Sequence, residues 1–336
     1  MNRLHDIAVV GAGIAGLSCA TALQAAGHRV RVFDKSGGTS GRMSTRRGDG
    51  WQCDHGAQFF AADHPAFQAE ISRWQQAGVA AFWTPRLRIE AGAQLRTRCN
   101  GAWHVGVPRM TAPARWLSGA CTLSQKTTIN AIAHAGQRWQ LQSAEHGALA
   151  QTFDAVVLAI PAPQARPLLR GGAPDLAGLA GRVAMQGCWA LMARFAAPLP
   201  LDFDAAALGQ GPLAWVARDN SKPGREGAET WLLHASTAWS EAHIEADAEF
   251  VSATLLQAFR ALGGTTPQAW TAHRWRYASG SVQLPEACVW RADPGIGLCG
   301  DWLNGGDVQG AWLSGRALAA QISKSIQIQP SGAVHA

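Results

Sequence analysis

The spacing of apolar positions at the N-terminus predicts a strand, a helix and a second strand in immediate succession. Residues 7–10 form a short apolar run with β-branched side chains and the length of a strand. Apolar positions between residues 17 and 23 then recur at helical spacing, and Gly27 is placed to end that helix. Residues 30–33 read as a second strand, which ends at Asp34. The pattern therefore predicts a complete β-α-β unit.

Three glycines join the first predicted strand to the helix in the spacing GxGxxG. Gly11 permits a tight turn, Gly13 lets the backbone approach a pyrophosphate, and Gly16 lets the helix pack closely on the strand. Free N–H groups at the helix N-terminus attract phosphate, and Asp34 can accept hydrogen bonds from ribose hydroxyls. We therefore expect this unit to bind a dinucleotide.

The rest of the chain contains two kinds of predicted segment. A continuously apolar run at 153–161 predicts a strand buried on both faces, and a strand at 296–302 ends at an acid before a helix over 308–326. Between them, strands are expected at 183–195, 213–217, 229–236 and 270–278, with one long helix over 246–262. This mixture predicts a second, mostly antiparallel unit inserted into the first.

Composition limits the class of protein. The 336 residues are 47% hydrophobic and 15% charged, which describes a globular chain with a sizeable core. No stretch reaches the roughly 18 apolar residues of a membrane span or resembles a signal peptide. The seven cysteines are scattered without CxxC, and HExxH is absent, so we expect reduced thiols, a cytoplasmic location and no structural metal.

The net charge of +6 admits two interpretations, a solvated basic surface or a field that steers an anionic substrate. No basic run is long enough to predict nucleic-acid binding. Fifteen tryptophans stand against one tyrosine, and some of them could line a pocket for a flat ligand. No nucleophile–base pair is evident, which disfavours hydrolytic chemistry.

Several motifs spread along the chain resemble those of FAD-dependent flavoproteins of the amine-oxidase and p-hydroxybenzoate-hydroxylase-like superfamily. They are the N-terminal glycine turn, Gly41-Arg42, Gly300-Asp301 and Gly310-Ala311. Within that superfamily the chain is most similar to bacterial renalases, through residues 33–36, 56–58, 215–218, 221–223, 231–235, 272–275 and 310–315. The resemblance implies an α/β fold, in which a discontinuous Rossmann-type FAD-binding domain carries an inserted, mostly antiparallel β substrate domain.

The resemblance implies FAD as the cofactor. Ile14 and Asp34 would hold its AMP half, Arg42 its pyrophosphate, and Ile129 would meet the adenine side through its backbone. An ordinary surface position for Arg42 remains the alternative. The remaining contacts would come from around Gln58, from Asp301, and from a helix opened by Gly310-Ala311 whose N-terminus stabilises reduced flavin. The expected cofactor-binding residues are Gly11, Gly13, Ile14, Gly16, Asp34, Lys35, Gly41, Arg42, Gln58, Phe59, Ile129, Gly300, Asp301, Gln309, Gly310 and Ala311.

The resemblance to renalases also implies the reaction, oxidation of isomeric dihydronicotinamides (2- or 6-dihydro-NAD(P)) to NAD(P)+, with O2 reduced to H2O2. No catalytic side chain is expected, since the flavin would accept the hydride at N5. The expected substrate pocket comprises Phe59, Phe60, Met185, Trp189, His234, Trp239, Arg274, Trp275 and Val308, and each of them could instead be a core residue. His234 and His273 in particular could be structural histidines.

Other flavin chemistries remain open at this stage. An amine oxidase or desaturase is weakened by the absence of lysine from residues 183–195 and by Tyr277 being the sole tyrosine, since a cage of two tyrosines cannot form. An aromatic hydroxylase, or a protein in which FAD is only structural, are further alternatives. The expected partners are a small-molecule substrate and O2.

The resemblance sets the expected domain boundaries. The FAD-binding domain would comprise residues 1–60, 125–165 and 286–326, and the substrate domain residues 61–124 and 166–285. Residues 327–336 would form a disordered tail.

Overall fold

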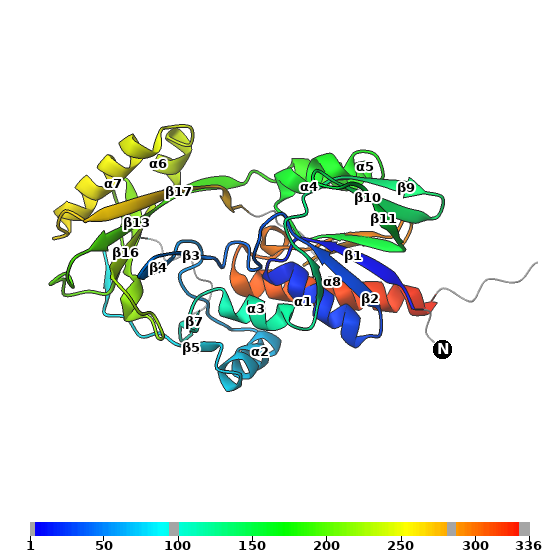
Figure 1. Cartoon of the computed structure of the whole chain (residues 1–336), viewed down its shortest axis with the longest axis horizontal. Helices are drawn as coiled ribbons and strands as arrows, with labels where there is room; N and C mark the ends of the chain where they lie inside the picture. The colour runs from blue at the N-terminus through cyan, green and yellow to red at the C-terminus, as the bar shows by residue number, and fades with distance from the viewer. Residues whose placement is uncertain (1–3, 94–100, 281–286, 329–336) are drawn as a thin grey trace, which may run out of the picture. The chain divides into compact units, whose positions relative to one another are not determined.

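The computed structural model describes residues 4–93, 101–280 and 287–328. The chain forms two compact units, each assembled from separate stretches of sequence (Figure 1). The first unit comprises Met1–Gly41, Ala114–Ala184 and Ser281–Ala336, and the second comprises Arg42–Pro113 and Met185–Gly280. The boundaries of these units differ from those of the expected domains. The division into an FAD-binding domain and a substrate domain stays a prediction. Most of the expected tail lies outside the described residues.

The first unit is built on a six-stranded sheet. Its strand order is β18 (Val289–Arg291), β19 (Ile296–Leu298), β12 (Ala155–Leu158), β1 (Asp6–Val10), β2 (Arg29–Phe33) and β8 (Thr122–Ser124). All neighbours pair in parallel except β18 with β19. The connection from β1 passes through α1 to β2 on one side, whereas β12, on the other side of β1, precedes β18 and β19, which lie farther out on that side, so the chain leaves these two adjacent strands in opposite directions. Ligands of open parallel sheets bind at such a position, beyond the carboxyl ends of the strands.

Helices α1 (Ile14–Ala25) and α8 (Val308–Ile328) run side by side in the first unit (Figure 1). Their backbones approach so closely at Gly315 that a Cβ there would lie 2.2 Å from the carbonyl oxygen of Ala15. The Ser18 hydroxyl donates a hydrogen bond of 2.8 Å to the carbonyl of Trp312, which fixes the two helices in register.

The rest of the first unit is a small antiparallel sheet and short helices. The sheet consists of β9 (Ile129–Ala135), β10 (Arg138–Ser143) and β11 (Gly147–Phe153). The helices are α4 (Ala162–Leu169), α5 (Pro174–Gly181) and α3 (Ala112–Ser118), which begins in the second unit.

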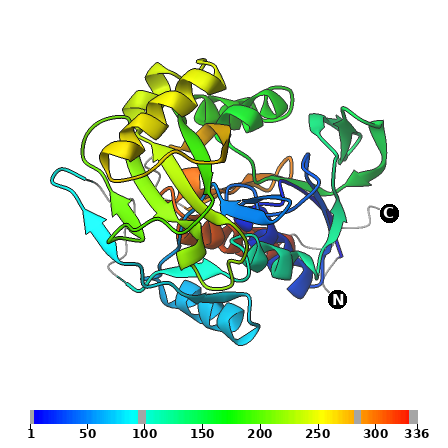
Figure 2. The ribbon, with the colours of Figure 1, turned by 60° about the vertical axis from the view of Figure 1, so that its left-hand side comes forward.

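The second unit is built on another six-stranded sheet, with order β17 (Ala269–Ser279), β13 (Gln186–Phe195), β16 (Glu229–Ala235), β15 (Leu213–Arg218), β14 (Ala205–Ala207) and β6 (Leu87–Ile89). Only β14 and β6 pair in parallel. Helices α6 (Thr237–Ala242) and α7 (Ala248–Ala261) lie over one face of it (Figure 2). The unit also contains α2 (Pro65–Gln76), the turn η1 (Asp219–Ser221), the hairpin β3 (Thr45–Gly48) with β4 (Trp51–Asp54), and the pair β5 (Ala80–Phe82) with β7 (His104–Gly106).

The two faces of this sheet have different surroundings because side chains alternate along a strand. On β13, Trp189 and Leu191 lie on the helix-covered face, in an apolar core with Phe259 of α7. The alternate residues Ala190 and Met192 lie on the opposite face, beside the β3–β4 hairpin. Around that small buried cluster, side chains of the opposite face such as Trp215, His234 and His273 are only half-buried, so this is the face that we consider for a ligand.

The predicted mixed α/β fold is confirmed. The β-α-β unit, the long helices and the strands of the second unit all form close to their expected ranges. One expectation was wrong in detail: the strand expected over 296–302 ends at Leu298, as β19, and is followed by the turn η2 (Asp301–Leu303).

Candidate functional site

The glycine turn of the first unit has the shape of a phosphate cradle. Gly11 has a φ of +108°, and a Cβ on Gly16 would lie 2.0 Å from the Gly11 carbonyl oxygen. By contrast, a Cβ on Gly13 would meet nothing within 4 Å. Gly13 caps α1 without a side-chain hydrogen bond, so the amides of the first turn, beginning at Ile14, have no side-chain acceptor. These observations fit the pyrophosphate of a dinucleotide.

Asp34, just beyond β2, is held beside this turn. Its Oδ2 accepts a hydrogen bond of 2.7 Å from the amide of Ala12, and its Oδ1 accepts one of 2.7 Å from Ser36. A carboxylate has about four acceptor positions, so the oxygens can also accept from ribose hydroxyls. The neighbouring Lys35 is exposed, and Gly41, with a φ of +53°, lies against the backbone of Gly13.

Helix α8 of the first unit begins close to its expected position. Helix α8 begins at Val308, and the amide of Gly310 donates a hydrogen bond of 2.6 Å to Asp307 Oδ1. Ala311 lies inside the first turn, where its amide donates to the carbonyl of Asp307. Gly310 and Ala311 thus lie in the first turn of α8, which Asp307 caps, and the contact of this helix end with the flavin stays a prediction.

The other expected cofactor residues of the first unit lie in buried positions. Asp301 and Gln309 are each 5% exposed, and Ile129 begins β9 at 8%. The amide of Gly300 donates a hydrogen bond of 2.9 Å to the hydroxyl of Ser314 in α8. Their contacts with FAD stay predictions.

In the second unit, Arg42 shapes the loop that follows β4. Its carbonyl oxygen accepts a hydrogen bond of 2.9 Å from Ala57, and a Cβ on Gly56 would lie 1.9 Å from that same oxygen. Its guanidinium donates to the carbonyl of Ala278, 3.1 Å away. Gly56 is therefore required by packing of the loop, and the role of Arg42 toward pyrophosphate stays a prediction.

The side chain of Gln58 belongs to a buried polar network rather than to an open surface. Its Nε2 donates to the carbonyl oxygens of Asp54 and Gly56, and its Oε1 accepts from Lys222 Nζ at 3.1 Å. These hydrogen bonds occupy both the nitrogen and the oxygen of the Gln58 side-chain amide. A side-chain contact from Gln58 to the flavin is therefore disfavoured.

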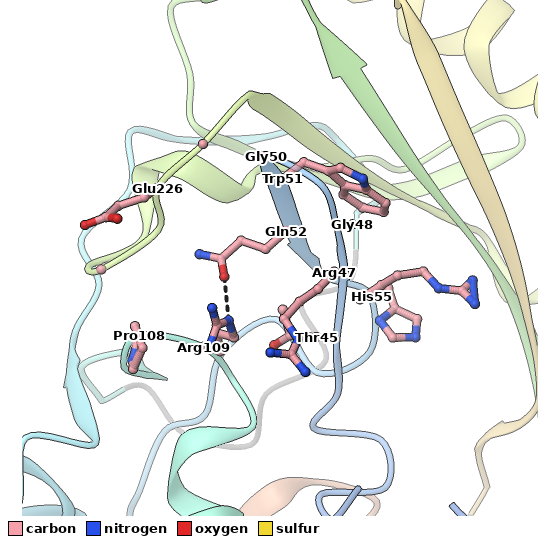
Figure 3. A pocket seen from close by; sticks show the side chains of 13 residues that line it. Thr45, Arg47, Gly48, Gly50, Trp51, Gln52, His55, Pro108, Arg109 and Glu226 are labelled. Atoms are coloured by element: carbon pink, nitrogen blue, oxygen red, sulfur yellow. Dashed lines mark hydrogen bonds between the residues drawn. The ribbon is translucent and has the colours of Figure 1, made fainter. Parts of the chain in front are cut away.

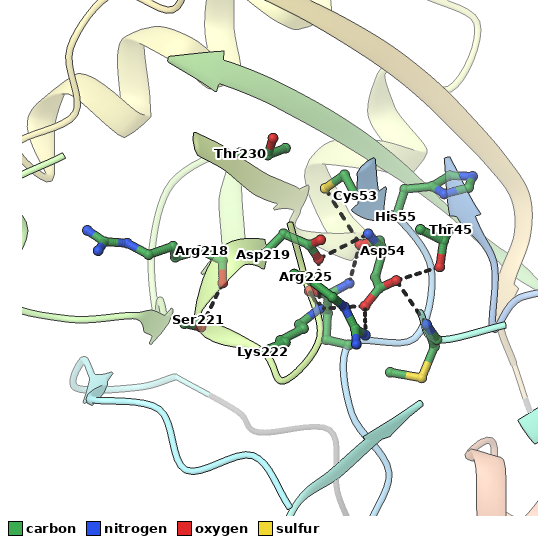
Figure 4. A network of polar contacts seen from close by, with 12 residues as sticks. Thr45, Cys53, Asp54, His55, Arg218, Asp219, Ser221, Lys222, Arg225 and Thr230 are labelled. Atoms are coloured by element: carbon green, nitrogen blue, oxygen red, sulfur yellow. Dashed lines mark hydrogen bonds and ion pairs between the residues drawn. The ribbon is translucent and has the colours of Figure 1, made fainter. Parts of the chain in front are cut away.

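Sequence reasoning missed the centre of this network, Asp54 with Asp219, Lys222 and Arg225 (Figure 4). Lys222 Nζ lies 3.2 Å from a carboxylate oxygen of each aspartate, and Arg225 pairs with Asp54 at 2.5 Å. These side chains are buried, and two cations balance two carboxylates. The sequence assigned none of these four side chains a role of its own.

The two aspartates respond differently to their surroundings. Burial alone would raise the pKa of Asp54, but the positive charges of Lys222 and Arg225 outweigh it and lower that pKa. For Asp219, burial and the charge of Asp54 raise the pKa above its usual value. The network therefore fixes Asp54 as the permanently ionised member.

The ligand-accessible face of the second sheet carries a row of aromatic and imidazole side chains, here called the aromatic face: Trp215, His234, His273, Trp275 and the adjacent His55. The carbonyl oxygen of His55 accepts from His234 Nε2 at 3.0 Å and from Trp275 Nε1 at 2.9 Å. Its ring stacks on Trp275, with centroids 5.1 Å apart.

Two imidazoles of the aromatic face, those of His55 and His273, have lowered pKa values. Burial, then the neighbouring His273 and Arg46, lower the pKa of His55 to about 3. Burial and Arg46 likewise lower the pKa of His273. Because His234 Nε2 faces a carbonyl oxygen, that nitrogen carries the proton.

Of the expected substrate residues, His234 and Trp275 lie on the aromatic face, and Phe59 continues it. The Phe59 ring stacks on Trp103 at 3.9 Å and lies 5.8 Å from the Trp215 ring. Met185 is half-buried just before β13, and Val308, in the first unit, begins α8.

Four expected substrate residues are core or helix-side residues instead. Trp189 is 4% exposed under α6, where its indole donates to the carbonyl of His243. Arg274 pairs opposite Trp189 and is bound to Glu245 at 2.9 Å. Trp239 stacks on His243 over the same face, and Phe60 packs against α2. The expectation of one pocket from all nine residues was wrong, because they lie on different faces.

The fold and the glycine cradle define a dinucleotide-binding flavoprotein. Residues 9–73 match the family model of NAD(P)-binding Rossmann-like domains, and residues 126–323, more than half of the chain, match that of flavin-containing amine oxidoreductases. The chain therefore belongs to the flavin-containing amine oxidoreductases, and its cofactor is FAD.

Individual relatives are matched over limited lengths. The chain is 40% identical over 70 residues to an L-amino-acid oxidase of Siganus canaliculatus, which is 20% of this chain and 13% of that protein. It is 30% identical over 200 residues, 46% of its length, to a bifunctional tRNA 5-methylaminomethyl-2-thiouridine biosynthesis protein of Magnetococcus marinus, of which it covers 29%. The chain thus spans less than a third of either relative.

Similarity of fold extends further. The structure of cyclohexylamine oxidase from Brevibacterium oxydans IH-35A superposes with a TM-score of 0.75 at 14% identity, covering 97% of this chain and 100% of that one. At that identity the likeness concerns the fold alone. Within the described residues, none of the helices combines the length and apolar character that crossing a bilayer demands.

Proposed function

We propose that the protein is an oxidase of isomeric dihydronicotinamide dinucleotides, as the resemblance to bacterial renalases implies. The substrate, 2- or 6-dihydro-NAD(P), would lose a hydride and become NAD(P)+. With one further proton, O2 would take up the two electrons and form H2O2. When bound, FAD supplies the ring that accepts the hydride and passes its electrons to oxygen.

One observation carries the choice of substrate: the aromatic face is rich in aromatic rings, and burial and the positive charge of Arg46 lower the pKa values of its imidazoles His55 and His273. Its members Trp215 and Trp275 offer indole rings for stacking a nicotinamide, and the Nε2–H of His234 is already satisfied. No carboxylate belongs to this row of described residues to pair with a protonated amine. The face therefore favours a neutral ring on an anionic molecule over a cation.

The chain's own residues act by binding and positioning. The glycine turn and Asp34 would hold the cofactor's AMP half and pyrophosphate, while the Asp54 network fixes the loop from Gly56 to Phe59. No proton transfer from a side chain is needed, because a dihydronicotinamide loses a hydride without an acid or base. The aromatic face excludes water and orients the ring.

The test is anaerobic mixing of the FAD-loaded protein with 2-, 4- and 6-dihydro-NAD(P). We expect bleaching of the flavin absorbance near 450 nm by the 2- or 6-isomer, about as fast as typical turnover at ~10 s⁻¹. Admitting O2 should restore the colour and give one H2O2 per substrate. Absence of bleaching by either isomer would refute the proposal.

An amine oxidase is the second candidate, because the family and the fold neighbours named above include enzymes of amines and amino acids. Such a reaction requires a deprotonated amine at the aromatic face. Bleaching by amines, with none by dihydronicotinamides, would favour this candidate instead.

A further inference from the structure

A pocket of about 1120 Å³ opens within the second unit, against the β3–β4 hairpin (Figure 3). It is here called the arginine pocket and defined by its charged and polar walls: Arg46, Arg47, Gln52, His55, Arg109 and Glu226. The remaining walls include Trp51 and several glycines, which leave backbone accessible. A pocket of this size can hold a nucleotide-sized ligand.

The charge of the pocket is unbalanced. Its lining includes three arginines but only one carboxylate, that of Glu226. Arg46 and Arg47 are exposed, and neither makes a side-chain hydrogen bond or ion pair with another described residue. Most other arginines of this unit behave differently: Arg86, Arg225 and Arg276 are each bound to a carboxylate. The pocket therefore holds positive charge that the protein itself does not neutralise.

Arg109 is held in place rather than free to move. Its Nε donates a hydrogen bond of 2.7 Å to Oε1 of Gln52, whose residue is 8% exposed in β4 (Figure 3). That bond fixes the plane of the guanidinium and leaves its two terminal nitrogens for a ligand. A fixed fork of N–H donors suits phosphate oxygens, which it can bind in bidentate fashion.

The arginine pocket and the aromatic face meet at one residue. His55 lines the pocket, and its ring stacks on Trp275 and meets His273 edge-on at 4.8 Å. All of these residues belong to the second unit. The wall of the arginine pocket thus packs directly against the aromatic face.

We propose that the arginine pocket binds the phosphate groups of a nicotinamide dinucleotide whose ring lies on the aromatic face. The inference rests on the proposed function and adds to it the part of the protein that recognises the substrate's phosphates. Arg47 and Arg109 are the principal ligands, and Glu226 weakens the affinity.

Binding is tested first, by calorimetry on the FAD-loaded protein with ADP-ribose and with inorganic pyrophosphate. We expect the double variant Arg47→Gln/Arg109→Gln to raise the Kd for ADP-ribose about tenfold or more, with added salt weakening the wild type most. Glu226→Gln should lower the Kd about two- to threefold, because it removes a like charge. Arg260→Gln, on α7 and outside the pocket, is the matched control and should change neither.

Turnover separates the pocket from the ring site. In the double variant we expect KM for 6-dihydro-NAD to rise about tenfold, while kcat stays within about twofold. The KM for the corresponding dihydronicotinamide riboside, which has no phosphate, should not change. Equal KM increases for both substrates would overturn the inference.

The two hypotheses can fail separately. If no dihydronicotinamide is oxidised but ADP-ribose binding still depends on Arg47 and Arg109, the pocket stands and the proposed reaction falls. If ADP-ribose and pyrophosphate do not bind the FAD-loaded protein, or bind all variants equally, the pocket inference is wrong. A third outcome would also contradict the pocket inference. The double variant could lose FAD, yet bind ADP-ribose as tightly as the wild type once FAD has been added back. The two arginines would then bind the phosphates of FAD and not those of the substrate.

Discussion

A single carboxylate, that of Asp54, joins parts of the second unit that lie far apart in the sequence. It bonds to Thr45 in the neighbouring strand, to the amide of Met110, and to Arg225, which is 171 residues away. Each partner comes from a different segment, so the loop after β4 is held from several directions. This is the residue on which the geometry of the loop at residues 56–59 depends.

Removing one cation from the Asp54 network should therefore be costly. Lys222→Met leaves two buried carboxylates with Arg225 alone, and we expect a loss of about 3–5 kcal/mol in the free energy of unfolding. Urea unfolding followed by tryptophan fluorescence measures it. Lys324→Met, at an exposed position of α8, is the control and should cost under about 0.5 kcal/mol. A loss below about 1 kcal/mol for Lys222→Met would contradict the structure.

The low pKa of His55, about 3, makes stability depend on pH. The unfolded chain, with a pKa near 6.5, takes up this proton more readily than the folded chain does. The stabilising contribution is thus complete above pH 6.5 and falls as pH decreases toward 3, by up to about 1.4 kcal/mol per pH unit. His104 and His273, whose pKa values burial also lowers, add to the slope.

Comparison with a variant shows whether His55 causes the dependence of the free energy of unfolding on pH. In His55→Phe, which retains a ring against Trp275, the free energy of unfolding should fall less steeply between pH 6.5 and 4, by about one proton. Urea titrations at several pH values measure this. An unchanged slope would mean that His55 is protonated in the folded protein.

Two glycines of the phosphate cradle should respond differently to alanine. In Gly16→Ala the new Cβ clashes with the Gly11 carbonyl, so both stability and FAD binding should be lost. In Gly13→Ala, with a φ of −74° and open space around the Cβ, the fold should be kept while FAD affinity falls about tenfold or more. The ratio of absorbance at 450 and 280 nm, with thermal unfolding, separates the two. Retention of FAD by Gly13→Ala would place the pyrophosphate elsewhere.

At the scale of single residues, the sequence predicts the positions of residues that lie close together in the chain. Gly11, Gly13 and Asp34 lie within one β-α-β unit, where spacing determines position. The partners of Asp54 escaped notice because Lys222 lies 168 residues away and only the tertiary fold brings it near. Charged residues that form a buried ion-pair network are not linked by any periodic pattern in the sequence.

At the scale of elements, alternation along strands explains the errors in the expected substrate pocket. Arg274 and Trp275 are neighbours in β17, so they must point to opposite faces of the sheet. The periodicity was available in the sequence, but which face is covered by helices was not. That depends on α6 and α7 packing over Trp189 and Leu191, which the structure alone shows.

Helix α7 provides a prediction for an element. Asp247 accepts hydrogen bonds of 2.9 Å from the amides of Glu249 and Phe250, which caps the helix over the apolar core. Asp247→Ala should cost about 1 kcal/mol in the free energy of unfolding, whereas Glu249→Gln, which keeps the cap, should cost no more than about 0.5 kcal/mol. Urea unfolding measures both. Equal losses would show that helix charge, rather than the cap, is responsible.

At the scale of the whole molecule, the chain passes between the two units four times, after residues 41, 113, 184 and 280. The sequence predicted the insertion of one unit into the other, because a pattern typical of dinucleotide-binding domains returns near residue 296. The exact crossing points were not, because Gly41 and Arg42 read as one loop motif yet belong to different units.

This connectivity predicts the outcome of truncation. A chain that ends at residue 280 lacks β19, which pairs with β12, and α8, which covers α1. We expect it to aggregate and to bind no FAD, because apolar residues such as Leu17 would be exposed. A chain that ends at residue 328 is the control and should purify yellow. A soluble, FAD-binding chain of 280 residues would show that the first unit folds without its last strand and helix.

The pairing of β12 with both β1 and β19 also bears on how the protein is made. Ribosomes add roughly 5–20 residues per second, so roughly 7–28 s separate the synthesis of β12 from that of β19. Throughout that interval the nascent sheet ends at β12, whose unpaired edge can recruit a strand from another nascent chain. We therefore expect the protein to depend on chaperones while it is being translated, and to acquire its cofactor only after release from the ribosome.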